Sequence, residues 1–126
     1  MADAAPHRID IAPFKGRVQV RWRDAVIADT TQALRLDETR HDPVYYIPRT
    51  DAAMDLFART SHHTHCPHKG DASYYSLVGT DGTRAENVVW TYETPIAKSA
   101  PIKGYLAFYT REMKLSVDID VTVSDA

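Results

Sequence analysis

Short apolar segments separated by turn-forming residues constrain the fold of this chain more than any other feature of its sequence. Proline, glycine and aspartate interrupt the chain so often that no apolar stretch approaches the roughly 18 residues of a membrane helix. Residues 17–23 and 114–123 alternate between apolar and polar side chains, the pattern of a strand with one buried face. This spacing predicts about six to eight short strands in a small antiparallel, mostly β domain, with about one or two short helices.

The turn signals between these segments predict how neighbouring strands pair. Asp81-Gly82 separates residues 72–78 from residues 84–92 and is the strongest hairpin signal in the chain. Residues 32–39 suit either a short strand or one helical turn. In the last expected strand, residues 114–123, Leu115 belongs to the apolar face, opposite a polar face that is left half exposed.

Length and composition predict one domain and few classes of partner. The 126 residues are expected to form a single β domain over residues 14–126 after a flexible arm over residues 1–13. A net charge of −2 with scattered basic residues predicts no nucleic-acid partner. The single cysteine fits a reducing compartment, and neither a signal peptide nor a membrane helix is recognisable, so a cytoplasmic location without a membrane partner is expected. No cofactor is predicted, and the oligomeric state is left open.

Reactive side chains are concentrated in residues 61–76, which contain Cys66 and four of the six histidines. A thiolate is the reactive form of cysteine, and a nearby cation favours it. Lys69 is three residues further on in an expected tight turn, so Cys66 and Lys69 are candidate catalytic residues, with Glu86 as a general base or as the partner of Lys69. The alternative is a buried Cys66 that acts as a small apolar side chain, with Lys69 in solvent.

Two of these histidines are candidate metal ligands. His63 and His65 share one face of an extended segment, and imidazole is a good ligand for zinc. Two ligands make only part of a site, so His41 or Glu86 would have to supply a third.

Aromatic residues are the candidate walls of a ligand pocket. Tyrosine and tryptophan combine an apolar ring with a polar tip, which suits a site for a small molecule. One of Tyr45 and Tyr46, together with Trp90 and Tyr92, is expected to line a cavity beside Cys66. Arg49 is a candidate anchor for a carboxylate or phosphate group of the ligand.

Several motifs occur in the order found in one protein family. They are VYYIP at 44–48, T-x-C-P-x-K-G-x-A-x-Y at 64–74, AEN at 85–87, W-x-Y at 90–92 and GYLAFY at 104–109. In these motifs the chain resembles, over residues 18–109, the family catalogued as domain of unknown function 427. The resemblance implies a small fold of the β-tent type, which methionine sulfoxide reductase B and cereblon-like ligand-binding domains share.

The chain departs from this group in two respects. Relatives with the β-tent fold often hold a structural zinc ion with four cysteines, and one cysteine cannot do so. The family also carries a label that suggests nucleotidyl transfer, but the sequence has no glycine-rich phosphate loop and no acidic pair placed for magnesium. The sequence therefore favours a small-ligand-binding or thiol-dependent enzymatic pocket around Cys66 and Lys69. The alternatives are a non-catalytic interaction or structural module and a histidine-rich metal site.

Overall fold

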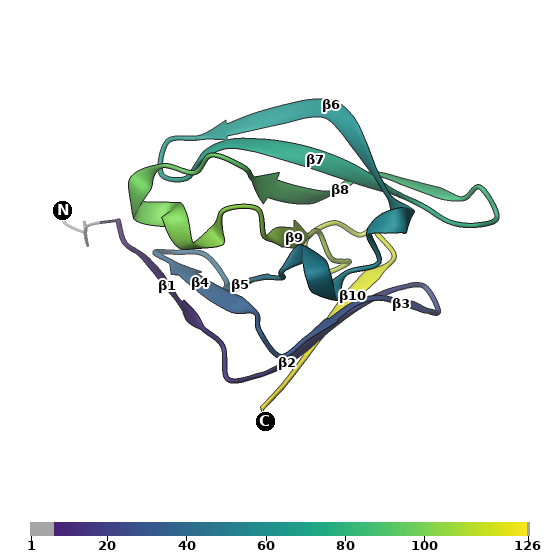
Figure 1. The fold of residues 1–126 in the computed structure, drawn as a ribbon, viewed down its shortest axis with the longest axis horizontal. Coiled ribbons are helices and arrows are strands. Elements are labelled where there is room, and N and C mark those ends of the chain that lie inside the picture. The colour runs from purple at the N-terminus through teal and green to yellow at the C-terminus, as the bar shows by residue number, and fades with distance from the viewer. Residues whose placement is uncertain (1–6, 126) are drawn as a thin grey trace.

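Ten strands and three short 3₁₀ turns make up the fold in the computed structural model, which describes residues 7–125 (Figure 1). In chain order they are β1 (Ile9–Pro13), β2 (Gly16–Trp22), β3 (Ala25–Thr30), β4 (Leu34–Glu38), β5 (Val44–Tyr46), η1 (Arg49–Asp51), η2 (Met54–Leu56), β6 (Phe57–Cys66), β7 (Gly70–Val78), β8 (Arg84–Tyr92), η3 (Ala97–Ile102), β9 (Leu106–Phe108) and β10 (Ile119–Asp125). None of these described elements is a helix long and apolar enough to cross a membrane.

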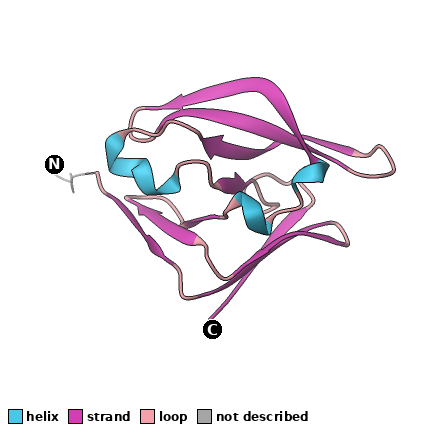
Figure 2. Cartoon of the chain, in the orientation of Figure 1, coloured by secondary structure: helices cyan, strands magenta, loops and turns pink. Residues whose placement is uncertain are grey.

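The strands form three antiparallel sheets, in the orders β6-β7-β8-β9, β1-β4-β5 and β10-β2-β3. The four-stranded sheet lies above the two three-stranded sheets in Figure 1, and Figure 2 shows the helical turns between these layers. The prediction of a mostly β, antiparallel domain is confirmed. Its helical part consists of three 3₁₀ turns rather than one or two short helices.

One pair of hydrogen bonds joins the four-stranded sheet to the sheet β1-β4-β5. Ile47 and Leu106 exchange both backbone hydrogen bonds, each 2.8 Å long, so the end of β5 is tied to the start of β9. Buried side chains of these two sheets form an apolar cluster with Ile102 of η3: Leu36, Tyr46, Ala72, Tyr74, Tyr92, Ile102 and Ala107. A larger cluster contains the inward residues of β2, Val18, Val20 and Trp22, which the sequence alternation placed on one face.

Two parts of the chain differ from expectation. Residues 1–6 of the expected arm lie outside the described residues, but Ile9–Pro13 is strand β1, paired with β4 from Ile9 opposite Glu38 to Pro13 opposite Leu34. The last strand begins at Ile119 rather than at residue 114, and Leu115 is 96% exposed. The reason is the length of its partner, because β2 ends at Trp22 opposite Ile119, and past this point Arg23 N–H bonds to the carbonyl of Asp118 before the chain turns away into β3.

Two further segments can be compared with the sequence, the β7–β8 hairpin and β4. β7 and β8 pair across the Asp81-Gly82 turn, so this hairpin prediction is confirmed. Gly82 has a φ of 85°, a conformation that glycine adopts without strain. Residues 34–38, which suited either a strand or a helical turn, form β4.

Candidate functional site

A cavity of about 550 Å³ lies between the sheets β1-β4-β5 and β6-β7-β8-β9. Its walls are aromatic: Tyr46 from β5, Tyr74 from β7, Trp90 and Tyr92 from β8, and Tyr109 after β9. Pockets for small molecules in proteins generally measure about 300–1,000 Å³ and have mostly apolar walls. The cavity has the size and the lining of such a pocket.

The turn between β6 and β7 places Cys66 and Lys69 at this cavity. Lys69 donates its backbone N–H to the carbonyl of Cys66 at 3.2 Å, which closes the turn. Gly70 follows with a φ of 111°, and a Cβ there would lie 3.3 Å from the carbonyl oxygen of Thr94, so this position favours glycine for two reasons. The turn leaves Lys69 Nζ at 4.0 Å from Cys66 Sγ. Cys66 is half-buried and carries a free thiol.

Glu38 completes a polar cluster with these two residues. Lys69 Nζ donates a 2.5 Å hydrogen bond to Glu38 Oε1, and the two side chains are only 12% and 10% exposed. His7 Nε2 donates to the other oxygen, Glu38 Oε2, at 2.8 Å. Burial by itself would raise the pKa of Glu38, but the hydrogen bonds from Lys69 and His7 outweigh it and hold that pKa below its ordinary value.

Hydrogen bonds and ring contacts order the aromatic walls. Trp90 Nε1 donates to the hydroxyl of Tyr46 at 3.2 Å, and the hydroxyls of Tyr74 and Thr64 share a 2.9 Å hydrogen bond. The ring centroids of Trp90 and Tyr109 are 4.9 Å apart. Burial raises the pKa of Tyr46 and Tyr92 above the ordinary value and that of Tyr109 to about 12, so these phenols are protonated near neutral pH.

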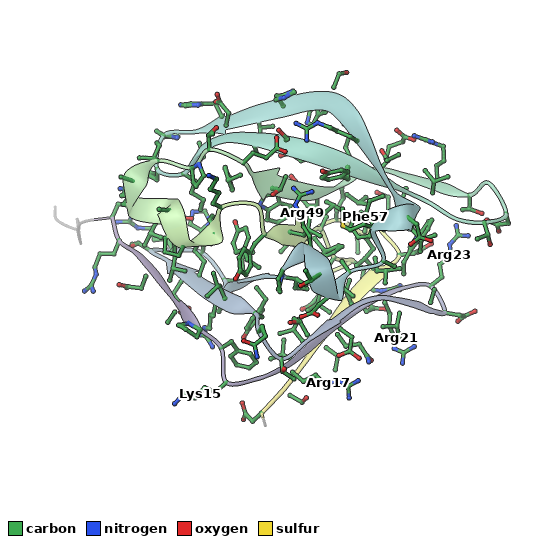
Figure 3. The ribbon with its side chains drawn as sticks, in the orientation of Figure 1. Lys15, Arg17, Arg21, Arg23, Arg49 and Phe57 are labelled. Carbon is green, nitrogen blue, oxygen red and sulfur yellow. The ribbon has the colours of Figure 1, made fainter. Side chains whose placement is uncertain are left out.

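The structure separates three of the expected site residues from this cavity. Glu86 is exposed, accepts a hydrogen bond from Arg84 at 2.5 Å and lines a different hollow of about 290 Å³. Tyr45 points into a neighbouring hollow of about 540 Å³, so Tyr46 is the member of that pair at the cavity. Arg49 (labelled in Figure 3) is half-buried and donates to the carbonyl of Gly104 and the hydroxyl of Tyr75, both at 2.7 Å. Its hydrogen bonds tie η1 to the body of the protein.

Glu38, His7, Tyr74 and Tyr109 belong to the cavity or its polar cluster but were not among the expected site residues. The signal for Glu38 was present in the sequence, since Leu34, Leu36 and Glu38 alternate as one face of a strand does. Two leucines on the inner face place the carboxylate there as well. The contribution of His7 has no comparable signal, because it depends on the pairing of β1 with β4, 31 positions away in sequence.

His63 and His65 are exposed on β6, at the open edge of the four-stranded sheet. His63 Nδ1 donates to the carbonyl of Ser61 at 2.8 Å, and His65 Nδ1 donates to the carboxylate of Asp71 at 2.7 Å. Within residues 7–125, no three His, Cys, Asp or Glu side chains are grouped so that they could hold a metal ion. A metal site at His63 and His65 stays a prediction, and neither His41 nor Glu86 supplies a third ligand on the same chain.

Basic side chains follow the exposed side of β2 and its ends, away from the cavity (Figure 3). Two of them are paired with acids: Arg17 donates to Asp29, and Arg23 lies 3.5 Å from Asp118. The neighbouring Lys15 and Arg21 are exposed as well. The acidic partners offset part of the positive charge on this surface.

The fold and the cavity define a small, mostly β domain with an aromatic-walled pocket and a thiol, an ammonium and a carboxylate at one end of it. The sequence model of the family described as domain of unknown function (DUF427) matches residues 10–119, and the chain belongs to this family. The resemblance seen in the motifs is thereby confirmed. No curated protein matches the chain.

The short label of this family, NTP_transf_9, refers to nucleotidyl transfer. That reaction commonly needs divalent cations held by carboxylates. At the cavity, both oxygens of Glu38 already accept hydrogen bonds from Lys69 and His7, and the described residues contain no group of three acidic, histidine or cysteine ligands. The residues present do not fit a magnesium-nucleotide site.

Proposed function

We propose that this protein binds a small organic molecule in the cavity between Tyr46, Tyr74, Trp90, Tyr92 and Tyr109. The observation that carries this proposal is the aromatic wall of the 550 Å³ cavity, which ends at the cluster of Cys66, Lys69 and Glu38. Aromatic side chains that border a cavity favour a flat apolar partner, and the polar cluster would orient it.

Thiol chemistry at Cys66 is the second candidate, and one distance favours it. Lys69 Nζ is 4.0 Å from Cys66 Sγ, where a positive charge favours a thiolate. Glu38 offsets that charge, since it accepts a hydrogen bond from the same ammonium. Binding is therefore the first proposal, and a reaction at the thiol would depend on the bound molecule being electrophilic.

The kinetics of alkylation by N-phenyl iodoacetamide test both candidates. The Cys66 thiolate attacks the methylene carbon, so a carbon–sulfur bond forms, the carbon–iodine bond breaks and iodide leaves with the electron pair, while the thiol proton goes to solvent. If the phenyl ring first binds between the aromatic walls, the rate saturates with reagent concentration. Burial of one ring adds about 1.5–3 kcal/mol, so the preference for this reagent over iodoacetamide should exceed that of N-acetylcysteine at least about tenfold.

Two variants complete the experiment. Cys66→Ser should take up no label, and Trp90→Leu should lower the preference for the phenyl reagent without abolishing labelling by iodoacetamide. A binding cavity would be contradicted if the rate rises linearly with the concentration of each reagent and if the ratio of the two rates equals that of N-acetylcysteine. If Cys66 reacts only when the protein unfolds, the turn at Cys66–Gly70 is structural and the non-catalytic module replaces the present proposal.

A further inference from the structure

We propose that the ligand of this cavity carries a hydrogen-bond-accepting oxygen, as a carbonyl or carboxylate group, on a flat apolar body. This inference rests on the proposed function and names the ligand class of the same cavity. It follows from the polar groups that face the cavity, because several donors there have no acceptor among the described residues, while both oxygens of Glu38 already accept hydrogen bonds.

Tyr92 supplies the first free donor. Its side chain lines the cavity, and within residues 7–125 its hydroxyl makes no hydrogen bond, so this O–H is open to the cavity. A ligand that displaces water from this hydroxyl without replacing its hydrogen bond loses about 1–3 kcal/mol. A ligand that covers Tyr92 should therefore bring an acceptor for its O–H.

Tyr46 supplies the second free donor. It is 1% exposed, and within the described part of the chain its hydroxyl oxygen accepts from Trp90 Nε1 but its O–H has no acceptor. Because burial raises the pKa of both Tyr46 and Tyr92, neither phenol becomes an acceptor-only phenolate near neutral pH. Both hydroxyls have the same requirement, an oxygen with free lone pairs.

Lys69 supplies a third donor, whereas the cavity offers few acceptors. An ammonium has three N–H groups, and those of Lys69 have two partners, Glu38 Oε1 at 2.5 Å and the weak acceptor Cys66 Sγ at 4.0 Å. The two oxygens of Glu38 are engaged by Lys69 and His7, and the remaining carboxylate, Asp42, is exposed at the rim. A ligand that brings only donors can bond to a tyrosine oxygen but leaves the O–H groups without an acceptor, whereas one that brings an acceptor satisfies them.

Three probes with the same phenyl ring separate these possibilities. Acetophenone carries a neutral acceptor, benzoate an anionic acceptor and benzylamine a cationic donor. Saturation-transfer difference NMR gives the dissociation constant of each probe for the wild-type protein. The variants are Tyr92→Phe, which removes the free hydroxyl without breaking any protein hydrogen bond that the structure shows, and the matched change Tyr45→Phe in the neighbouring hollow.

Acetophenone or benzoate should bind at least about tenfold more tightly than benzylamine, and Tyr92→Phe should weaken the tighter probe about fivefold, the effect of one hydrogen bond. Tyr45→Phe should leave its affinity unchanged. Tighter binding of acetophenone would indicate a carbonyl ligand, and tighter binding of benzoate a carboxylate ligand. If benzylamine binds as tightly as both, or if Tyr92→Phe has no effect, the acceptor class is wrong although the cavity still binds small molecules. If no probe binds, the proposed function fails and this inference with it.

Discussion

Replacement of Glu38 by glutamine is the most informative test of the polar cluster. At neutral pH the carboxylate accepts two charge-assisted hydrogen bonds, from Lys69 and His7, and each such bond contributes about 1.5–3 kcal/mol. Glutamine keeps one acceptor oxygen but removes the charge, and it leaves the ammonium of Lys69 in a place where its side chain is 12% exposed. Loss of one partner of a fully buried pair is destabilising by about 3–5 kcal/mol, and the open cavity reduces this, so we expect a loss of about 2–3 kcal/mol.

Urea unfolding followed by tryptophan fluorescence measures this loss as a change in the free energy of unfolding. The matched control is Glu86→Gln, the same substitution at an exposed carboxylate paired with Arg84, for which the change should stay within about 0.5 kcal/mol. In a double-mutant cycle, Glu38→Gln and Lys69→Met should couple by about 1.5 kcal/mol or more. Equal effects of Glu38→Gln and Glu86→Gln, or the absence of coupling, would refute the buried cluster.

Four further predictions concern the rest of the molecule. Gly70→Ala should destabilise the protein more than Gly82→Ala in the same unfolding assay. Both positions have a positive φ, but only at Gly70 would the new Cβ meet backbone atoms, at 3.3 and 3.4 Å. Equal losses of stability would contradict this. Arg49→Met should lower the free energy of unfolding by about 2 kcal/mol or more through loss of the hydrogen bonds to Gly104 and Tyr75, and Arg49→Lys should restore only part of it; full restoration would show that charge alone suffices. Hydrogen bonds from Arg59 lower the pKa of Glu93 from 4.5 to about 2, so the contribution of Glu93 to stability is present above pH 4.5 and is lost as the pH falls towards 2. Glu93→Gln should therefore flatten the dependence of the free energy of unfolding on pH over that range. An unchanged slope would speak against the Arg59–Glu93 pair. His63 and His65 give a zinc ion only two ligands, so zinc added to the protein should be removed by dialysis. His63→Ala should abolish any weak zinc binding that is detected by calorimetry. Stoichiometric zinc after dialysis would disprove this.

The β7–β8 hairpin and the buried face of β2 could be predicted from the sequence, because their signals are local. The Asp81-Gly82 turn and the alternation of Val18, Val20 and Trp22 each reflect the geometry of a few successive residues. The strand expected from residue 114 illustrates the limit of this reasoning. Alternation shows that a segment can be a strand, but a strand also needs a partner, and β2 ends opposite Ile119.

The candidate site could be predicted from the sequence in part. The motif around Cys66 located the turn that brings the thiol and Lys69 together, since two residues three positions apart in one tight turn must be close. The partner of Lys69 could not be found in this way, because Glu38 lies 31 residues earlier and meets it only when β4 packs beneath the β6-β7 turn. Glu86, closer to Lys69 in sequence, faces a different hollow. Alternation also assigned Tyr45 and Tyr46 to opposite faces but could not say which face would border a cavity.

The position of a bound small molecule tests the central claim most directly, and the two tryptophans of the chain report it. Trp90 lines the proposed binding cavity, whereas Trp22 belongs to the other apolar cluster and borders a separate hollow. In a ¹H–¹⁵N spectrum recorded during titration with acetophenone and with benzoate, the indole N–H signal of Trp90 should shift in a saturable way with at least one of the probes, while that of Trp22 stays in place. Saturable shifts of Trp22 with an unmoved Trp90 signal, or no saturable shift of either, would contradict a ligand site between the two sheets.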